Sequence, residues 1–153
     1  MVDVGDRAPD FELDDQHGQR VRLSSFRGRK RVVVLFYPFA FSPVCSAEMR
    51  AVRDDVEGLG GDDVVVLAVS CDSRFALRYF ADQLGSSHPL LSDFWPHGEV
   101  SRRYGVFDER RGCATRGTFV IDLDGVVRWK IHNGLPDARD QGAYLRALAD
   151  IAR

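Results

Sequence analysis

The chain has 153 residues, enough for one ordinary domain with its own hydrophobic core, and we expect residues 1–153 to form a single domain. Hydrophobic residues make up 44% and charged residues 29% of the chain, and the formal net charge of −2 excludes a general affinity for nucleic acid or a membrane surface. No apolar run approaches the ~20 residues of a membrane-spanning helix. Residues 1–6 lack the basic and apolar segments of a secretory signal, so we expect a cytoplasmic protein.

The first predicted element is a β-hairpin. Residues 11–13 and 21–23 alternate apolar and polar side chains on either side of the turn sequence Asp15-Gln16-His17-Gly18. The basic run Arg27-Gly28-Arg29-Lys30-Arg31 follows, and we expect it to be a solvated loop before the next strand.

The remaining elements alternate buried strands with amphipathic helices. In the first half of the chain we expect a strand over 32–37, a helix over about 44–58, a strand over 64–70 and a helix over 73–84. A short strand over 90–93 and a short helix over about 97–104 follow. We then expect two strands, over 117–122 and 126–129, around the turn dipeptide Asp124-Gly125, and a last helix over about 141–152. This order predicts an α/β, thioredoxin-like fold. It has a central mixed β-sheet flanked by helices and an N-terminal β-hairpin extension.

The most informative residue is Cys45, which follows the first buried strand and the segment Pro38-Phe39-Ala40-Phe41-Ser42-Pro43-Val44. The residues after it are typical of an amphipathic helix, so Cys45 is expected in the first turn of that helix. There its sulfur faces unpaired backbone N–H groups and the positive end of the helix dipole. Both favour the thiolate, which is the reactive form of cysteine. The placement predicts chemistry at this sulfur.

The other cysteines, Cys71 and Cys113, share no motif spacing with Cys45, so we expect three free thiols. Thioredoxins carry a C-x-x-C motif at this helix start, but here Ser46-Ala47-Glu48 follows Cys45. This argues against a thiol–disulfide oxidoreductase. Two alternatives stay open: Cys45 as a small buried hydrophobic residue, and Cys45 as the reactive group of a redox sensor or holdase.

Three motifs in order along the chain resemble those of the peroxiredoxins. They are Ala8-Pro9-Asp10-Phe11, then Pro38-x-x-x-Ser42-x-x-Cys45, then Arg116-Gly117-Thr118-Phe119-Val120-Ile121-Asp122. The stretch Leu91-Ser92-Asp93-Phe94-Trp95-Pro96-His97-Gly98 and the sequence around Cys45 are most similar to the one-Cys alkyl hydroperoxide reductase E group of actinobacteria. Each motif is weak alone, but together they span nearly the whole chain.

The resemblance implies a thiol-dependent peroxidase that reduces hydrogen peroxide, organic hydroperoxides or peroxynitrite without a cofactor. Cys45 attacks the peroxide and becomes a sulfenic acid. By the same resemblance, Arg116 and Ser42 bind the thiolate and the peroxide oxygens, and Pro38 packs over the sulfur. The backbone of Val44 completes the oxygen-binding site. Apart from the resemblance, the apolar side chains of Phe39, Phe41 and Trp95 could offer a surface to a lipid hydroperoxide.

Several of these residues also have purely structural interpretations. Ser42 followed by Pro43 is typical of a helix N-cap, which is compatible with a catalytic hydroxyl. Arg116 alone could pair with Asp122 or Asp108. Glu48 could orient Arg116, or it could be an acidic residue that suits the first turn of a helix.

The source of the reducing thiol follows from where the cysteines are. Some peroxiredoxins carry a second, resolving cysteine five residues after the first, and others carry it near the C-terminus. Here the position five residues after Cys45 is Arg50, and the C-terminus carries no cysteine. We therefore expect an external reductant: a low-molecular-weight thiol, a glutaredoxin-like protein or a thioredoxin-like protein. Cys113 and then Cys71 remain possible resolving cysteines.

The resemblance further implies a homodimer, with the region of Trp95 in an interface rather than in the core. The four histidines share no ligand spacing with the cysteines, so no metal site is expected.

Overall fold

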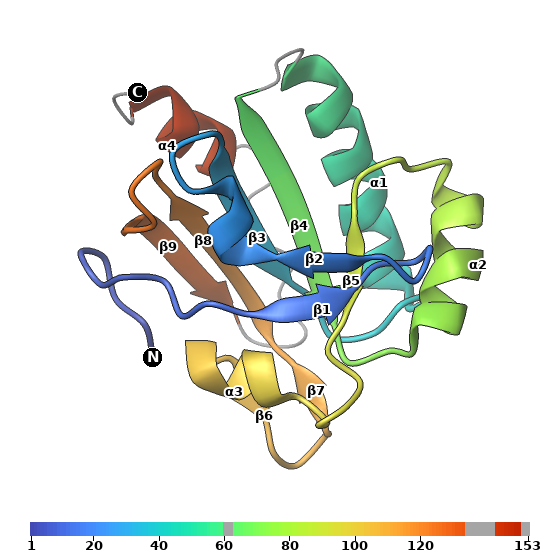
Figure 1. Ribbon diagram of the computed structural model, residues 1–153. Coiled ribbons are helices and arrows are strands. Elements are labelled where there is room, and N and C mark those ends of the chain that lie inside the picture. The colour runs from blue at the N-terminus through green and yellow to red at the C-terminus, as the bar shows by residue number, and fades with distance from the viewer. Residues whose placement is uncertain (60–62, 134–142, 151–153) are drawn as a thin grey trace.

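The computed structural model describes residues 1–59, 63–133 and 143–150, and Figure 1 shows strands and helices alternating along most of the chain. The strands are β1 (Glu12–Asp14), β2 (Arg20–Arg22), β3 (Arg31–Phe36), β4 (Val64–Ser70), β5 (Leu90–Ser92), β6 (Phe107–Asp108), β7 (Cys113–Ala114), β8 (Arg116–Ile121) and β9 (Val127–Asn133). The helices are the 3₁₀ turn η1 (Leu23–Phe26), α1 (Pro43–Leu59), α2 (Arg74–Leu84), α3 (Glu99–Tyr104) and α4 (Ala143–Asp150).

Seven strands form the central sheet in the order β2-β1-β5-β4-β3-β8-β9. The inner strands β3, β4 and β5 are parallel, and the remaining neighbours pair antiparallel. The sheet is therefore mixed, as the sequence predicted. The parallel pairing also brings the carboxyl ends of β3 and β4 to one edge, where the loop that leads to Cys45 begins.

The strand β3 is buried on both faces, which explains its continuous apolar sequence. Val33 and Leu35 pack in a core with α1, α2 and α4, while Val32, Val34 and Phe36 pack in a second core with α3 and the N-terminal segment. Side chains two residues apart share a face because a strand has a period of two. The sheet thus lies between two helical layers, and the thioredoxin-like fold is confirmed.

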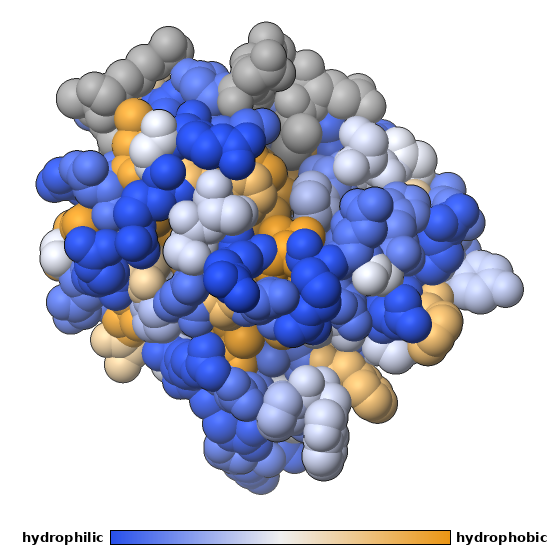
Figure 2. Space-filling view, in the orientation of Figure 1, coloured by the Kyte–Doolittle hydropathy of each residue, from blue (hydrophilic) through white to orange (hydrophobic). Residues whose placement is uncertain are grey.

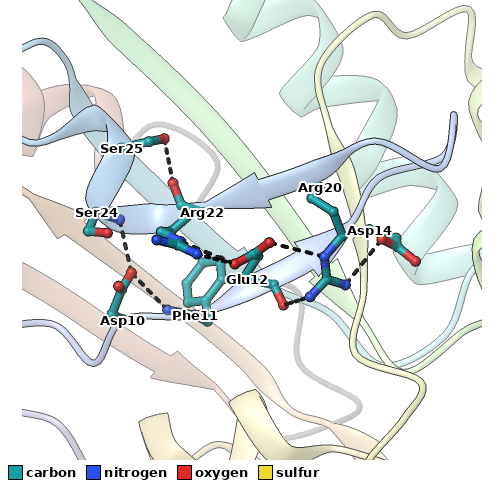
Figure 3. A network of polar contacts seen from close by, with 8 residues as sticks. All are labelled: Asp10, Phe11, Glu12, Asp14, Arg20, Arg22, Ser24 and Ser25. Carbon is teal, nitrogen blue, oxygen red and sulfur yellow. Dashed lines mark hydrogen bonds and ion pairs between the residues drawn. The ribbon is translucent and has the colours of Figure 1, made fainter.

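The N-terminal hairpin is confirmed. Ion pairs between side chains of β1 and β2 stabilise its solvent-facing side. Figure 3 shows Glu12 accepting from Arg20 and Arg22, while Arg20 also donates to Asp14 at 3.1 Å. Figure 2 shows hydrophilic side chains over the centre of this face of the molecule. Because the hairpin is the edge of the sheet, these charges protect its outer strand from pairing with another chain.

The basic run departs from the prediction at its last residue. Arg31 is buried as the first residue of β3; it donates to the Leu148 carbonyl at 2.7 Å and pairs with Asp63 at 3.2 Å. Only Arg27, Gly28 and Arg29 are fully exposed. Arg31 therefore ties α4 to the sheet rather than belonging to a solvated loop.

Other departures concern the second half of the chain. The small β6–β7 sheet was not predicted, β9 runs beyond the expected end at Trp129, and α3 begins at Glu99 rather than at His97. The predicted helix 141–152 is observed over Ala143–Asp150, and its remaining positions lie outside the described residues. The helix predicted over about 44–58 is observed over Pro43–Leu59. Within the described ranges, no helix is long and apolar enough to cross a membrane.

Candidate active site

Cys45 is the third residue of α1, in its first turn. The helix begins at Pro43, and its first bond runs from the Ser46 N–H to the Ser42 carbonyl at 2.8 Å. Ser42 therefore stands at the N-cap position, as its sequence context predicted. The side chain of Cys45 is completely buried. A sulfur so placed faces backbone N–H groups that the helix itself leaves unpaired.

Arg116 reaches the sulfur from the first residue of β8. This strand pairs antiparallel with β3, so its beginning lies beside the end of β3 and the loop that follows. Nη1 of Arg116 donates to Sγ of Cys45 at 3.5 Å. The structure thus brings together two residues that are 71 positions apart in the sequence.

Glu48 pairs with the same nitrogen of Arg116. It lies three residues after Cys45, so both side chains are on one face of α1. All three are buried, with exposures of 0% for Cys45, 2% for Glu48 and 3% for Arg116. A buried charge is stable only when it is paired, and Glu48 supplies that pair. Of the two interpretations of Glu48, the geometry agrees with an orienting contact to Arg116.

The alternative partners of Arg116 have other contacts. Asp122 pairs with Arg128 at 2.6 Å and accepts from the Val126 N–H. Asp108 accepts from the backbone N–H groups of Arg110 and Arg111. Both carboxylates therefore hold turns of their own, whereas Arg116 is buried and pairs with Glu48.

The remaining predicted site residues lie in the loop between β3 and α1. The hydroxyl of Ser42 donates to the Phe39 carbonyl at 3.2 Å, and Pro38 is buried. Phe39 and Val44 are exposed, at 44% and 38%. Pro38 therefore belongs to the inner part of the loop, Ser42 is half-buried, and Phe39 and Val44 form the outer surface of the loop.

Cys71 and Cys113 are both buried free thiols. Cys71 directly follows β4, and Cys113 is the first residue of β7. Burial raises the pKa of Cys71 to about 12 and the pKa of Cys113 to about 11. Both thiols are therefore protonated at neutral pH, and protonated thiols are poor nucleophiles.

Two residues near the site carried no sequence signal. Tyr37 ends the apolar run before Pro38 and is completely buried; burial, together with the nearby Asp72 and Cys45, raises its pKa and keeps the hydroxyl protonated. Asp72 accepts from the N–H of Ala40 at 2.8 Å, in the loop before Cys45. Only the position of Asp72 at the end of the neighbouring strand could have indicated such a contact.

Trp95 and Phe94 are 81% and 51% exposed, which excludes a place in the core of this chain. They line a groove of about 570 Å³, together with Phe75 of α2. None of the residues around Cys45 lines this groove. Within the described part of the chain, no three His, Cys, Asp or Glu side chains lie together in a way that could hold a metal ion.

Comparisons with known proteins agree with this geometry. The AhpC/TSA family model matches residues 4–130. Over 151 residues the chain is 44% identical to alkyl hydroperoxide reductase E of Mycobacterium tuberculosis, covering 99% of both proteins. Among solved structures, AhpC of Enterococcus faecalis superposes with a TM-score of 0.87 at 28% identity, covering 97% of this chain and 92% of that one. Peroxidoxin BcpB of Mycobacterium tuberculosis superposes with a TM-score of 0.83 at 32% identity, covering 97% and 96%.

Proposed function

This chain belongs to the AhpC/TSA family of peroxiredoxins and is a thiol-dependent peroxidase, and we propose that Cys45 is the sulfur that reduces the peroxide. The observation that carries the proposal is the contact of 3.5 Å between Nη1 of Arg116 and Sγ of Cys45 at the start of α1. A fixed guanidinium and a helix N-terminus together favour the thiolate over the thiol.

In the first step, the Cys45 thiolate attacks the terminal oxygen of the hydroperoxide. A sulfur–oxygen bond forms as the oxygen–oxygen bond breaks, and the leaving oxygen takes a proton and departs as water or an alcohol. Arg116 stabilises the negative charge as it moves from sulfur to the leaving oxygen. The hydroxyl of Ser42 and the N–H groups of Val44 and Cys45 bind the peroxide oxygens. Cys45 is left as a sulfenic acid.

Several features of the loop suit this role. Pro38 is buried in the loop before Cys45, where it helps to exclude water and so strengthens the electrostatic contacts of the site. Phe39 and Val44 are exposed at the outer surface of the loop, where they offer apolar contact to an organic hydroperoxide. We propose hydrogen peroxide, organic hydroperoxides and peroxynitrite as substrates.

An external thiol completes the cycle. Its thiolate attacks the sulfur of the sulfenic acid, the sulfur–oxygen bond breaks, and the oxygen leaves as water. A second thiol then cleaves the mixed disulfide and releases the Cys45 thiolate. The raised pKa values of Cys71 and Cys113 support this route, because neither thiol is ionised for an internal attack. The reductant is a low-molecular-weight thiol, a glutaredoxin-like protein or a thioredoxin-like protein.

The proposal also includes the cellular compartment and the oligomeric state of the protein. The three free cysteines are suited to a reducing compartment, so we place the protein in the cytoplasm. The exposed aromatic side chains of Phe75, Phe94 and Trp95 suit an interface between two copies of the chain, so we propose a homodimer.

The proposal is tested by adding one equivalent of hydrogen peroxide to the reduced protein and trapping sulfenic acid with dimedone. We expect a single adduct, located at Cys45 by peptide mapping, and two thiols that still titrate. A stoichiometric disulfide joining Cys45 to Cys113 or to Cys71 would contradict the external reductant. An unmodified Cys45 would contradict the proposed role of the residue itself.

A further inference from the structure

We propose that Asp72 is a positioning residue for peroxide reduction, which holds the loop before Cys45 in its reactive conformation. The inference rests on the proposed role of Cys45. Oδ2 of Asp72 accepts a hydrogen bond of 2.8 Å from the backbone N–H of Ala40, 32 residues earlier in the chain. Ala40 is buried in the middle of the segment between β3 and α1.

Asp72 is itself fixed from two neighbouring strands, through its carboxylate on one side and its backbone carbonyl on the other. The hydroxyl of Ser70, a completely buried residue at the end of β4, donates to the same Oδ2 at 2.8 Å. The hydroxyl of Ser92, at the end of β5, donates to the Asp72 carbonyl at 2.7 Å. The acceptor that faces Ala40 is therefore part of the rigid end of the sheet rather than a free surface side chain.

The loop needs such a tie because its conformation is costly. Phe41, directly after Ala40, has φ +71°, in the left-handed region that residues other than glycine rarely adopt. Such a conformation is strained and persists only where its surroundings impose it. A hydrogen bond to an ionised carboxylate is stronger than one between neutral groups, and here it is made by the residue next to the strained one.

The consequence for chemistry is geometric. The same loop carries Ser42, whose carbonyl accepts the first hydrogen bond of α1, and Cys45 follows three residues later. A loop released from Asp72 would let the start of α1 move relative to Arg116, which is fixed separately on β8. The approach of peroxide and the contact between Cys45 and Arg116 both depend on that relative position. Misplacement by about 1 Å can slow a reaction by roughly 10²-fold.

Electrostatics alone would predict faster oxidation of Cys45 when the Asp72 carboxylate is removed, the opposite of what a positioning role predicts. A carboxylate near Cys45 opposes the negative charge of the thiolate, so removing it should favour reaction if charge were all that mattered. A positioning role instead requires an acceptor in this place, with or without its charge. Asparagine offers that acceptor oxygen in a side chain of the same shape, whereas alanine offers none.

The test compares Asp72→Ala and Asp72→Asn in two reactions of Cys45: oxidation by hydrogen peroxide and alkylation by iodoacetamide, followed by mass spectrometry at that residue. We expect Asp72→Ala to be oxidised at least ~10-fold more slowly, because the loop is no longer held. It should be alkylated several-fold faster, because the sulfur, completely buried here, becomes accessible. Asp72→Asn should stay within about threefold of the unmodified protein in both reactions.

A control variant separates the effect of lower protein stability from the effect of a displaced loop. Ser73, the next residue, accepts from the Ala76 N–H at 3.2 Å as the N-cap of α2. Ser73→Ala removes a hydrogen bond to a backbone N–H close to Asp72, and it lowers the stability of the protein without touching the loop before Cys45. We expect it to leave both rates unchanged. Ser70→Ala, which removes the hydroxyl that fixes the Asp72 carboxylate, should shift both rates in the same directions as Asp72→Ala, but less.

The outcomes separate this inference from the proposed function. Oxidation of Asp72→Ala at the unmodified rate, or an Asp72→Asn variant as slow as Asp72→Ala, would overturn the positioning role. If Asp72→Ala does not fold, unchanged rates in Ser70→Ala would overturn it equally. The proposed function is tested separately: it fails if Cys45→Ser still consumes peroxide as fast as the unmodified protein.

Discussion

At the scale of single residues, the site depends on how one guanidinium is shared. Nη1 of Arg116 donates both to Glu48 and to Cys45, and all three side chains are almost completely buried. Glu48 holds the guanidinium in place, but its charge also offsets part of the positive charge that the thiolate experiences. The two effects oppose each other, and a pair of variants can separate them.

Glu48→Ala removes both the charge and the acceptor, whereas Glu48→Gln removes only the charge. Loss of the buried ion pair between Glu48 and Arg116 should destabilise the alanine variant by about 3 kcal/mol. Its oxidation by peroxide should be roughly 10-fold slower, because the guanidinium is no longer aimed at the sulfur. The glutamine variant should retain most of the rate. Urea denaturation and stopped-flow oxidation measure the two effects, and an alanine variant that reacts at full rate would exclude an orienting role for Glu48.

His88 makes stability depend on pH. It is buried, and burial lowers its pKa from the ordinary 6.5 to about 4. Between these two pH values the unfolded chain binds the proton more readily than the folded one, so the free energy of unfolding falls as the pH falls. The loss across this window is at most about 3 kcal/mol.

The variant His88→Asn removes this titration and should flatten the pH dependence of the free energy of unfolding between pH 6.5 and 4. Urea denaturation at several pH values measures it. His17, an exposed histidine, provides the control, and His17→Asn should keep the original slope. An unchanged slope in His88→Asn would show that other groups cause the acid sensitivity.

At the scale of elements, α3 begins at a glycine that the structure requires. Gly98 has φ +70°, and a Cβ there would lie 2.2 Å from the ring of Phe107. Gly98→Ala should therefore lose about 2 kcal/mol of unfolding free energy or more, from strain and from the displaced ring. Gly85 has φ +63° at the end of α2, and a Cβ there would meet no atom within 4 Å, so Gly85→Ala isolates the strain alone. Equal losses of unfolding free energy in Gly85→Ala and Gly98→Ala would contradict a clash between the added Cβ and the ring of Phe107.

The elements also show what the sequence could and could not predict. The apolar run before Pro38 and the pair Ser42-Pro43 were enough to predict a buried strand and a helix start, because both signals are local. The β6–β7 sheet was missed because each strand has only two residues, too few for a period. Arg31 was assigned to a loop from its charge, although its partners lie in distant elements. The contact of Asp72 with Ala40 is long-range in the same way.

At the scale of the whole molecule, large apolar side chains are exposed on α2 and on the segment before α3. Phe75 and Tyr79 of α2 are 69% and 73% exposed. Phe75 and Trp95 line one groove, and the ring of Phe41, from the loop before Cys45, lies 5.2 Å from that of Phe80 in α2. Helix α2 therefore contributes Phe75 to the proposed dimer interface and packs Phe80 against the loop before Cys45.

If this surface joins two copies, Trp95→Arg should convert the protein to a monomer, because a buried arginine without a partner opposes association. Analytical ultracentrifugation at micromolar concentration measures the mass. Val4, an apolar residue that is 54% exposed and does not line the groove, provides the control. Val4→Arg should remain dimeric. An unmodified protein that sediments as a monomer would contradict the interface.

The central claim, that Cys45 reacts because Arg116 and the start of α1 hold it, is tested most directly by stopped-flow oxidation of the reduced protein. Hydrogen peroxide and a fatty-acid hydroperoxide are compared in the unmodified protein, Cys45→Ser and Arg116→Ala. We predict rapid oxidation that is abolished by Cys45→Ser and slowed roughly 10²–10³-fold by Arg116→Ala. Oxidation of the unmodified protein no faster than that of a free thiolate, or an Arg116→Ala variant that reacts at the full rate, would contradict the account.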